Sequence, residues 1–173
     1  EELREMTTAL DVVPSLGADI VKASWRRCLT DYGLDRAMRK PIERVEQATV
    51  RDLRGQMENV LTESSTVIDR VRRIAADTGN VVLIGNSDGI VVTSFADSNT
   101  SQEIAREGLE AGTVWHEGRV GTNGIGTCLI SRQPITVYGG AHFNEAFRHF
   151  TCSAAPIFGP DGQVIAAFDM SGR

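Results

Sequence analysis

The sequence lacks several features that would each point to a particular class of protein. No apolar run approaches the ~20 residues that cross a bilayer, and no secretory leader opens the chain. The three cysteines form no C-x-x-C pair and have no partner at zinc-ligand spacing, which predicts reduced, buried thiols. These absences favour a cytoplasmic protein with no membrane partner, disulfide framework, metal or cofactor.

An excess of basic charge is also missing. The 173 residues carry 18 Lys and Arg against 23 Asp and Glu, for a net charge of −5. Phosphate-rich partners require a concentrated basic face, so this segment is not expected to grip DNA itself. The pairs Arg26-Arg27 and Arg72-Arg73 are expected on solvated helix faces.

Helical patterns dominate the first half. One helix is expected to begin near a capping Ser15 and to end before Gly33. A longer pattern runs from 42 to 76, and as one helix it would extend roughly 50 Å, more than the width of a small domain. This length predicts a helical bundle that forms a homodimer. The alternative is a kinked helix that wraps its own core.

Strand patterns follow, and they divide the chain into an N-terminal helical region, 1–79, and a sheet domain, 80–173. Two β-branched runs, 81–84 and 90–93, flank turn residues and predict a hairpin. A short polar helix is expected at 101–108 and further strands at 135–138, 153–158 and 164–170. Antiparallel strands with helices grouped to the side predict an α+β fold.

The densest motif is the glycine-rich segment 115–127. Its glycines allow sharp bends and close approach to a ligand, and Thr122 or Asn123 can cap a helix that runs to about residue 131. Such a helix start offers N–H groups to a carbonyl or oxyanion. The glycine order is not that of a dinucleotide fingerprint, and a Walker lysine is missing. The residues leave two interpretations open, namely a ligand pocket and a tight loop that holds a core helix.

Other candidate side chains have plainer interpretations. His116, His142 and His149 match no zinc pattern and are expected to be exposed or internally satisfied. Cys152 is expected as a small core residue on a strand. Asp169 lies in an apolar strand and needs either a ligand or a backbone turn as a partner. No nucleophilic triad is present, so the chain is not expected to be an enzyme.

Taken together, the motifs resemble those of a known family. Residues 24–28 are similar to the S-W-x-R-C signature of bacterial regulators of acetoin and glycerol/dihydroxyacetone metabolism. Residues 115–117, 121–127, 142–143, 151–157 and 169–172 resemble the W-x-E, G-T-N-x-I-G-T, H-F, T-C-S-A-x-P-I and D-x-S-G motifs of their sensory domain. The chain is therefore identified as resembling the GAF sensory domain of the acetoin/dihydroxyacetone-type sigma-54-dependent transcription regulators.

The resemblance implies a GAF fold, with helices on one face of an antiparallel sheet and a ligand pocket on the other. It also implies a longer regulator, in which DNA contact and ATP hydrolysis belong to domains absent from this chain. Within the family, alanine is frequent where this chain has Gly124, so the resemblance does not fix the ligand.

The expected function is to bind a small metabolite, such as a hydroxyketone, and to signal through the long helix. The candidate ligand-binding residues are Trp115, Glu117, Thr122, Asn123, Thr127, His142, Phe143 and Cys152. Three alternatives remain: a module that senses a partner protein such as a kinase subunit, a cysteine-based reductase of free methionine sulfoxide, and a haem-based sensor.

Overall fold

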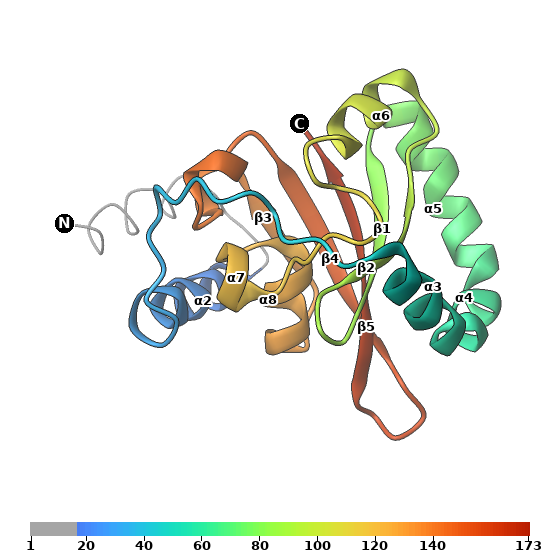
Figure 1. Cartoon of the computed structure of the whole chain (residues 1–173), viewed down its shortest axis with the longest axis horizontal. Coiled ribbons are helices and arrows are strands. Elements are labelled where there is room, and N and C mark those ends of the chain that lie inside the picture. Colours follow the sequence, from blue (N-terminus) through green and yellow to red (C-terminus); the bar gives the residue numbers. More distant parts are fainter. Residues whose placement is uncertain (1–16) are drawn as a thin grey trace.

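The computed structural model describes residues 17–173, so the expected capping Ser15 lies outside the described part. Its centre is a five-stranded antiparallel sheet with the strand order β2-β1-β5-β4-β3 (Figure 1). The strands are β1 (Val81–Asn86), β2 (Val91–Phe95), β3 (Ile135–Tyr138), β4 (Thr151–Phe158) and β5 (Val164–Gly172). All the strands expected from the sequence are present.

The expected hairpin is formed by β1 and β2. The Asn86 side chain closes its turn, because Oδ1 accepts hydrogen bonds from the backbone N–H groups of Asp88 and Ile90. Along β1 the burial is continuous, and Leu83 and Ile84 point to opposite faces and belong to different core clusters. A strand buried on both sides requires cover on both faces of the sheet.

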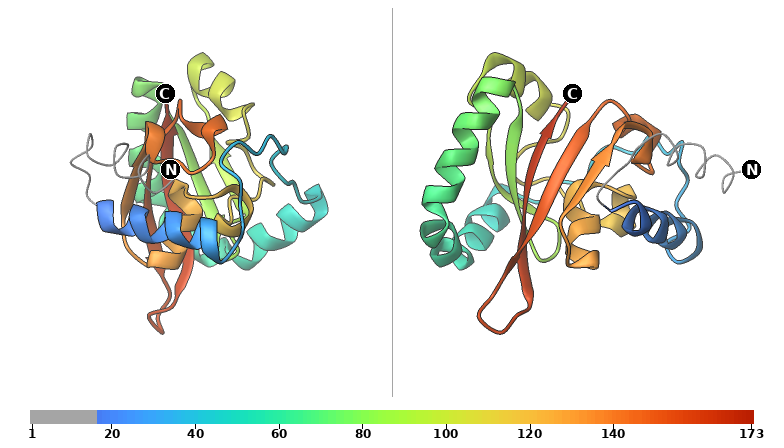
Figure 2. Two further views of the ribbon diagram at one scale, coloured as in Figure 1. Left: turned by 90° about the vertical axis from the view of Figure 1, so that its left-hand side faces the viewer. Right: turned by 180° about the vertical axis from the view of Figure 1, so that it is seen from behind.

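One face of the sheet packs against α2 (Ala18–Thr30), α7 (Glu117–Val120) and α8 (Gly124–Ser131) (Figure 2). This face holds the larger core. Val21, Trp25 and Cys28 on α2 are buried in the same cluster as Leu83 on β1, so α2 shares the core of the sheet.

The other face carries α3 (Gln47–Gln56), α4 (Glu58–Glu63) and α5 (Ser65–Thr78). The prediction of one continuous helix is wrong. The backbone leaves regular helical geometry at Met57 (φ −97°, ψ 6°) and Ser64 (φ −88°, ψ 0°). The three short helices bend around an apolar cluster that includes Met57 and Ile68, as the kinked alternative predicts. The length of a single helix therefore no longer supports a dimer, and the dimer itself stays a prediction.

The α+β class with an antiparallel sheet is confirmed, but the helices cover both faces and not one. The remaining helices are α6 (Asn99–Ala105) and two 3-10 turns, η1 (Gly139–Ala141) and η2 (Glu145–Phe147). Residues 31–46, here called the strap, cross the molecule from α2 to α3 (Figure 1). No helix in the described range is long and apolar enough to cross a membrane.

Candidate functional site

A buried polar network joins the first motif of the chain to the glycine-rich segment. The Glu117 side chain is fully buried, and its carboxylate accepts hydrogen bonds from Ser24 Oγ (2.6 Å) and Arg27 Nε (2.8 Å). Ser24 Oγ also lies 2.7 Å from Thr122 Oγ1 and 3.3 Å from Thr127 Oγ1. Ser24 on α2 therefore lies within hydrogen-bond distance of Glu117, Thr122 and Thr127, three of the side chains predicted from the sequence as ligand contacts.

Arg27 corrects the expectation that Arg26-Arg27 forms a solvated pair. Arg27 makes a bidentate ion pair with Glu117, and its side chain is only 25% exposed. A paired cation stabilises the charge of a buried carboxylate, and Arg27 lies three residues after Ser24 on the same side of α2. This spacing, taken with the apolar face of the helix, was the available signal. Ser24 and Arg27 are thus site residues that the sequence analysis missed.

The start of α8 matches the prediction. Asn123 caps the helix, because its Oδ1 accepts from the Gly126 N–H (2.8 Å) while its Nδ2 donates to the Gly121 carbonyl (2.8 Å). Gly126 is required here, since an added Cβ would lie 2.4 Å from the Trp115 carbonyl oxygen. The loop thus presses directly against its own helix start, as the tight-loop interpretation predicts.

A second polar cluster lies at the same helix start. His142 Nε2 is 3.3 Å from Cys152 Sγ, and its Nδ1 is 3.1 Å from the Gly139 carbonyl. Asp169 accepts a 2.5 Å hydrogen bond from Ser171 Oγ at Oδ2, whereas its buried Oδ1 has no partner among the described residues. The partner of Asp169 is therefore the side chain of a serine two residues along its own strand, and not the ligand or backbone turn that was expected.

Burial controls the protonation of this cluster. It lowers the pKa of His142 to about 4, so the imidazole is neutral at physiological pH. It raises the pKa of Asp169 to about 7, against a smaller lowering by the Ser171 hydrogen bond. It also raises the pKa of the Cys152 thiol. A neutral imidazole beside a protonated thiol is not an activated nucleophile pair.

The eight predicted binding residues are brought together on one side of the sheet, and each is at most 3% exposed. The Nε1–H group of Trp115 donates a hydrogen bond to the Gly108 carbonyl. Phe143 packs edge-on against Trp25, with 5.4 Å between the ring centroids. None of the eight lines the pockets beside the strap and α7, between the strap and η2, or along α3, α4 and α5. Ligand binding by these side chains stays a prediction.

The outer side of the same segment does border a pocket, here called the strap pocket. Its volume is about 260 Å³, and it lies between the strap, α7 and η2. Its lining includes Leu34, Met38, Lys40, Glu43, Arg119, Val120, Asn144 and Phe147. Phe147 also contacts Trp115, with 4.9 Å between ring centroids, so the predicted tryptophan lies one layer behind the pocket.

Asn144 supplies the buried polar group of the strap pocket. It is 3% exposed, and its Oδ1 accepts from the Ala146 N–H at 2.9 Å. The Nδ2 donor is left without a protein partner in the described structure. An amide donor above an apolar floor is typical of small-molecule sites.

The histidines behave as the sequence suggests. His116 caps α7, accepting from the Gly118 N–H, and the exposed His149 pairs with Glu107 at 2.7 Å. Within residues 17–173, no three His, Cys, Asp or Glu side chains are grouped so that they could hold a metal ion.

The fold is shared with a chain of known structure. The crystal structure of the Escherichia coli DhaR(N)–DhaL complex contains a chain that matches 88% of this one with a TM-score of 0.79. The match covers 51% of that chain at 19% sequence identity. The α+β architecture is thus GAF-like, in agreement with the resemblance seen in the motifs.

The particular family follows from the sequence. Residues 5–173 match the N-terminal domain of MimR, and the chain belongs to this family. It is 29% identical to the acetoin catabolism regulatory protein of Cupriavidus necator over 88% of its length, and 28% identical over 87% to the acetoin dehydrogenase operon transcriptional activator AcoR of Bacillus subtilis. It spans 23% and 25% of those two proteins, about a quarter of their length.

Proposed function

We propose that the chain is the metabolite-sensing domain of a bacterial sigma-54-dependent transcriptional activator, and that the strap pocket holds the metabolite. The strap pocket carries this proposal because it borders residues 118–120 of the glycine-rich segment. DNA contact would be made only by other domains of the regulator.

The lining of the strap pocket favours a small, uncharged, polar metabolite. Val120 and Phe147 form a buried apolar floor, and Asn144 Nδ2 can donate to a carbonyl or hydroxyl oxygen. At the rim Arg119 lies 3.7 Å from Glu43, so these two charges offset each other. Lys40 is then one exposed, solvated cation, which provides no specific site for an anion. Two relatives are named for acetoin, which is a hydroxyketone of this kind.

The position of the strap provides a route for the signal. Strap residues line the pocket, and the strap leads directly into α3. On the far side of the pocket, residues 118–120 continue from Glu117, which holds α2 through Arg27. A ligand that binds one strap position more tightly would shift α3 relative to α2.

The test is thermal unfolding of the chain with increasing acetoin, since a ligand of the native state raises the melting temperature. We expect a saturable rise that Asn144→Asp abolishes. This variant keeps the Oδ1 cap of η2 and removes the Nδ2 donor. Asn99→Asp, at an exposed position on α6, is the matched control. An equal rise in wild type and Asn144→Asp would remove the strap pocket from consideration.

A second candidate function is to sense a protein, because the related chain of known structure was crystallised with DhaL. A partner-sensing domain would bind its partner with unchanged affinity when the strap pocket is altered. Affinity capture with wild-type and Asn144→Asp domains, followed by titration of any captured partner, separates the two functions.

Two further expectations complete the proposal. Homodimer formation is supported by Val67 and Ile74, which are 62% and 49% exposed and lie seven residues apart on α5. Sedimentation that shows only monomer at micromolar concentration would contradict it. Absence of catalysis is supported by the cysteines, because burial raises the pKa of Cys28 to about 11 and of Cys128 to about 12. A turnover assay on free methionine sulfoxide with thioredoxin would detect the reductase activity.

A further inference from the structure

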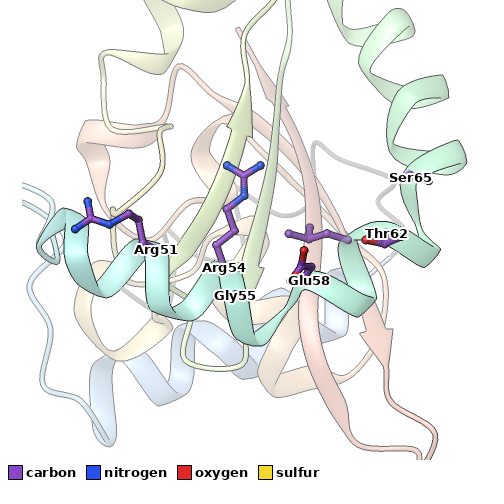
Figure 3. Close-up of a pocket in the computed structure, with 7 residues that line it drawn as sticks. Arg51, Arg54, Gly55, Glu58, Thr62 and Ser65 are labelled. Carbon is purple, nitrogen blue, oxygen red and sulfur yellow. The ribbon is translucent and has the colours of Figure 1, made fainter.

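A larger pocket lies in the angle between α3, α4 and α5 (Figure 3). Its volume is about 550 Å³, and it shares no lining residue with the strap pocket. The side chains that line it are Arg51, Arg54, Glu58, Leu61, Thr62 and Ser65. Because these positions recur every three or four residues, they form one stripe along the bent helical segment. We call this the hinge pocket.

Two arginines, Arg51 and Arg54, give the hinge pocket positive charge. Arg27, Arg44 and Arg72 each pair with a carboxylate, whereas Arg51 and Arg54 have no ion-pair partner in the described part of the chain. A guanidinium fork matches the geometry of a carboxylate. In Figure 3 the Arg54 side chain extends from α3 into the angle between α3 and α5, while the Arg51 side chain points toward the N-terminal end of α3. Arg54 is therefore the principal contact for an anionic group.

The remaining side chains restrict what kind of anion fits. Glu58 contributes a carboxylate close to Arg54 along the stripe, and it would repel a polyanion such as a polyphosphate. The same carboxylate accepts a hydrogen bond from a hydroxyl group. The hydroxyls of Thr62 and Ser65 add polar contacts, and the half-buried Leu61 offers an apolar surface. The set matches a molecule with one carboxylate, one hydroxyl and an apolar body.

We infer that the hinge pocket is a second effector site, which binds a hydroxycarboxylate with an apolar body. It spans the two positions, Met57 and Ser64, where the helical segment bends. A ligand that contacts α3 and α5 at once favours one bend angle over others. The site does not depend on the function proposed for the strap pocket.

The test uses three molecules of one size on the 15N-labelled chain of 173 residues. They are 3-phenyllactate, 3-phenylpropionate, which lacks the hydroxyl, and 3-phenyl-1,2-propanediol, which lacks the carboxylate. We expect phenyllactate to shift the backbone amide signals of residues 51–65 saturably, phenylpropionate to bind several-fold more weakly, and the diol to leave these signals unchanged.

Variants locate the contact. Arg54→Gln should raise the dissociation constant for phenyllactate about tenfold, because it removes a charge-assisted hydrogen bond. Arg73→Gln removes the same charge from α5 outside the hinge pocket and should change the constant less than twofold. The inference is overturned if the diol binds equally well, if Arg54→Gln binds like wild type, or if the shifts appear at residues 118–120 and 144–147. None of these results affects acetoin binding, which tests the strap pocket separately.

Discussion

The face of the sheet that packs against α2, α7 and α8 contains buried polar groups within its core, whereas the face under α3, α4 and α5 rests on a small apolar cluster. On the first face, Ser24, Arg27 and Glu117 each need a specific partner at hydrogen-bond distance. On the second face, apolar side chains such as Met57 and Ile68 need only to remain buried away from water. Hydrogen bonds specify one arrangement, while apolar contacts tolerate small sliding movements.

We infer from this difference that one face of the sheet is fixed and that the helices on the other face can move. The networked face holds the glycine-rich segment in one geometry and thereby forms a fixed wall of the strap pocket. The apolar face carries helices that are already bent at two places, so a change in angle there breaks few specific contacts. Four predictions test the comparison.

The largest effect is expected from Glu117→Ala. The substitution leaves Ser24 and Arg27 without their buried acceptor, and loss of one partner from a buried ion pair costs about 3–5 kcal/mol. Equilibrium unfolding in urea measures the change. Glu43→Ala is the control, because Glu43 is exposed and lies 3.7 Å from Arg119, an ion pair worth less than about 1 kcal/mol. Similar losses for the two variants would mean that the network does not distinguish this face.

A pH-dependent effect is expected from Asp169. Burial raises its pKa to about 7 in the folded chain, from an ordinary value of 3.8. Between these two values the folded state binds a proton that the unfolded state has lost, so stability rises as the pH falls from about 7 to 4. Above pH 7 both states are ionised and the cost of the buried charge is fully present.

Urea unfolding between pH 5 and pH 8 measures this contribution. The loss for wild type relative to Asp169→Asn should be about 2–3 kcal/mol over that range. Asp77→Asn, at an exposed position on α5, should keep the wild-type pH dependence. A flat difference between wild type and Asp169→Asn would show that Asp169 is ionised throughout.

The sequence predicted the networked face better than the other. Periodicity and turn residues located the strands, and the cap at Asn123 was correct because capping is a local interaction. The family motifs also gathered the eight candidate residues on one side of the sheet. Local patterns could not identify the partners of Glu117, since Ser24 lies 93 and Arg27 lies 90 positions earlier.

The prediction of one helix over residues 42–76 was wrong for a different reason. The apolar spacing of this segment continues through Met57 and resumes after Ser64, so periodicity predicts one long helix. The bends arise because Met57, Leu61 and Ile68 must cover a curved, twisted sheet. The strap pocket was also missed, because it depends on the strap crossing α7 and η2, and no motif in the strap signals that contact.

Gly126→Ala tests how closely the networked face is packed. An added Cβ would lie 2.4 Å from the Trp115 carbonyl oxygen and 2.5 Å from the Glu117 nitrogen, and these backbone atoms cannot rotate away. Overpacking of this kind costs about 1–3 kcal/mol, which urea unfolding would show as a lower midpoint. Unchanged stability would mean that the loop relaxes freely and is not a fixed wall.

The smallest effect has the opposite sign and concerns the other face. Gly55 lies in α3, and an added Cβ would meet no atom within 4 Å. Alanine restricts the unfolded chain and favours a helix, so Gly55→Ala should stabilise the protein by about 0.5–1 kcal/mol. The same urea measurement checks it against Gly126→Ala, which makes the same chemical change on the networked face. If Gly55→Ala is instead destabilising, α3 must be packed more tightly than its exposed surface indicates. The bend at Met57 would then be fixed by contacts as specific as those around Glu117.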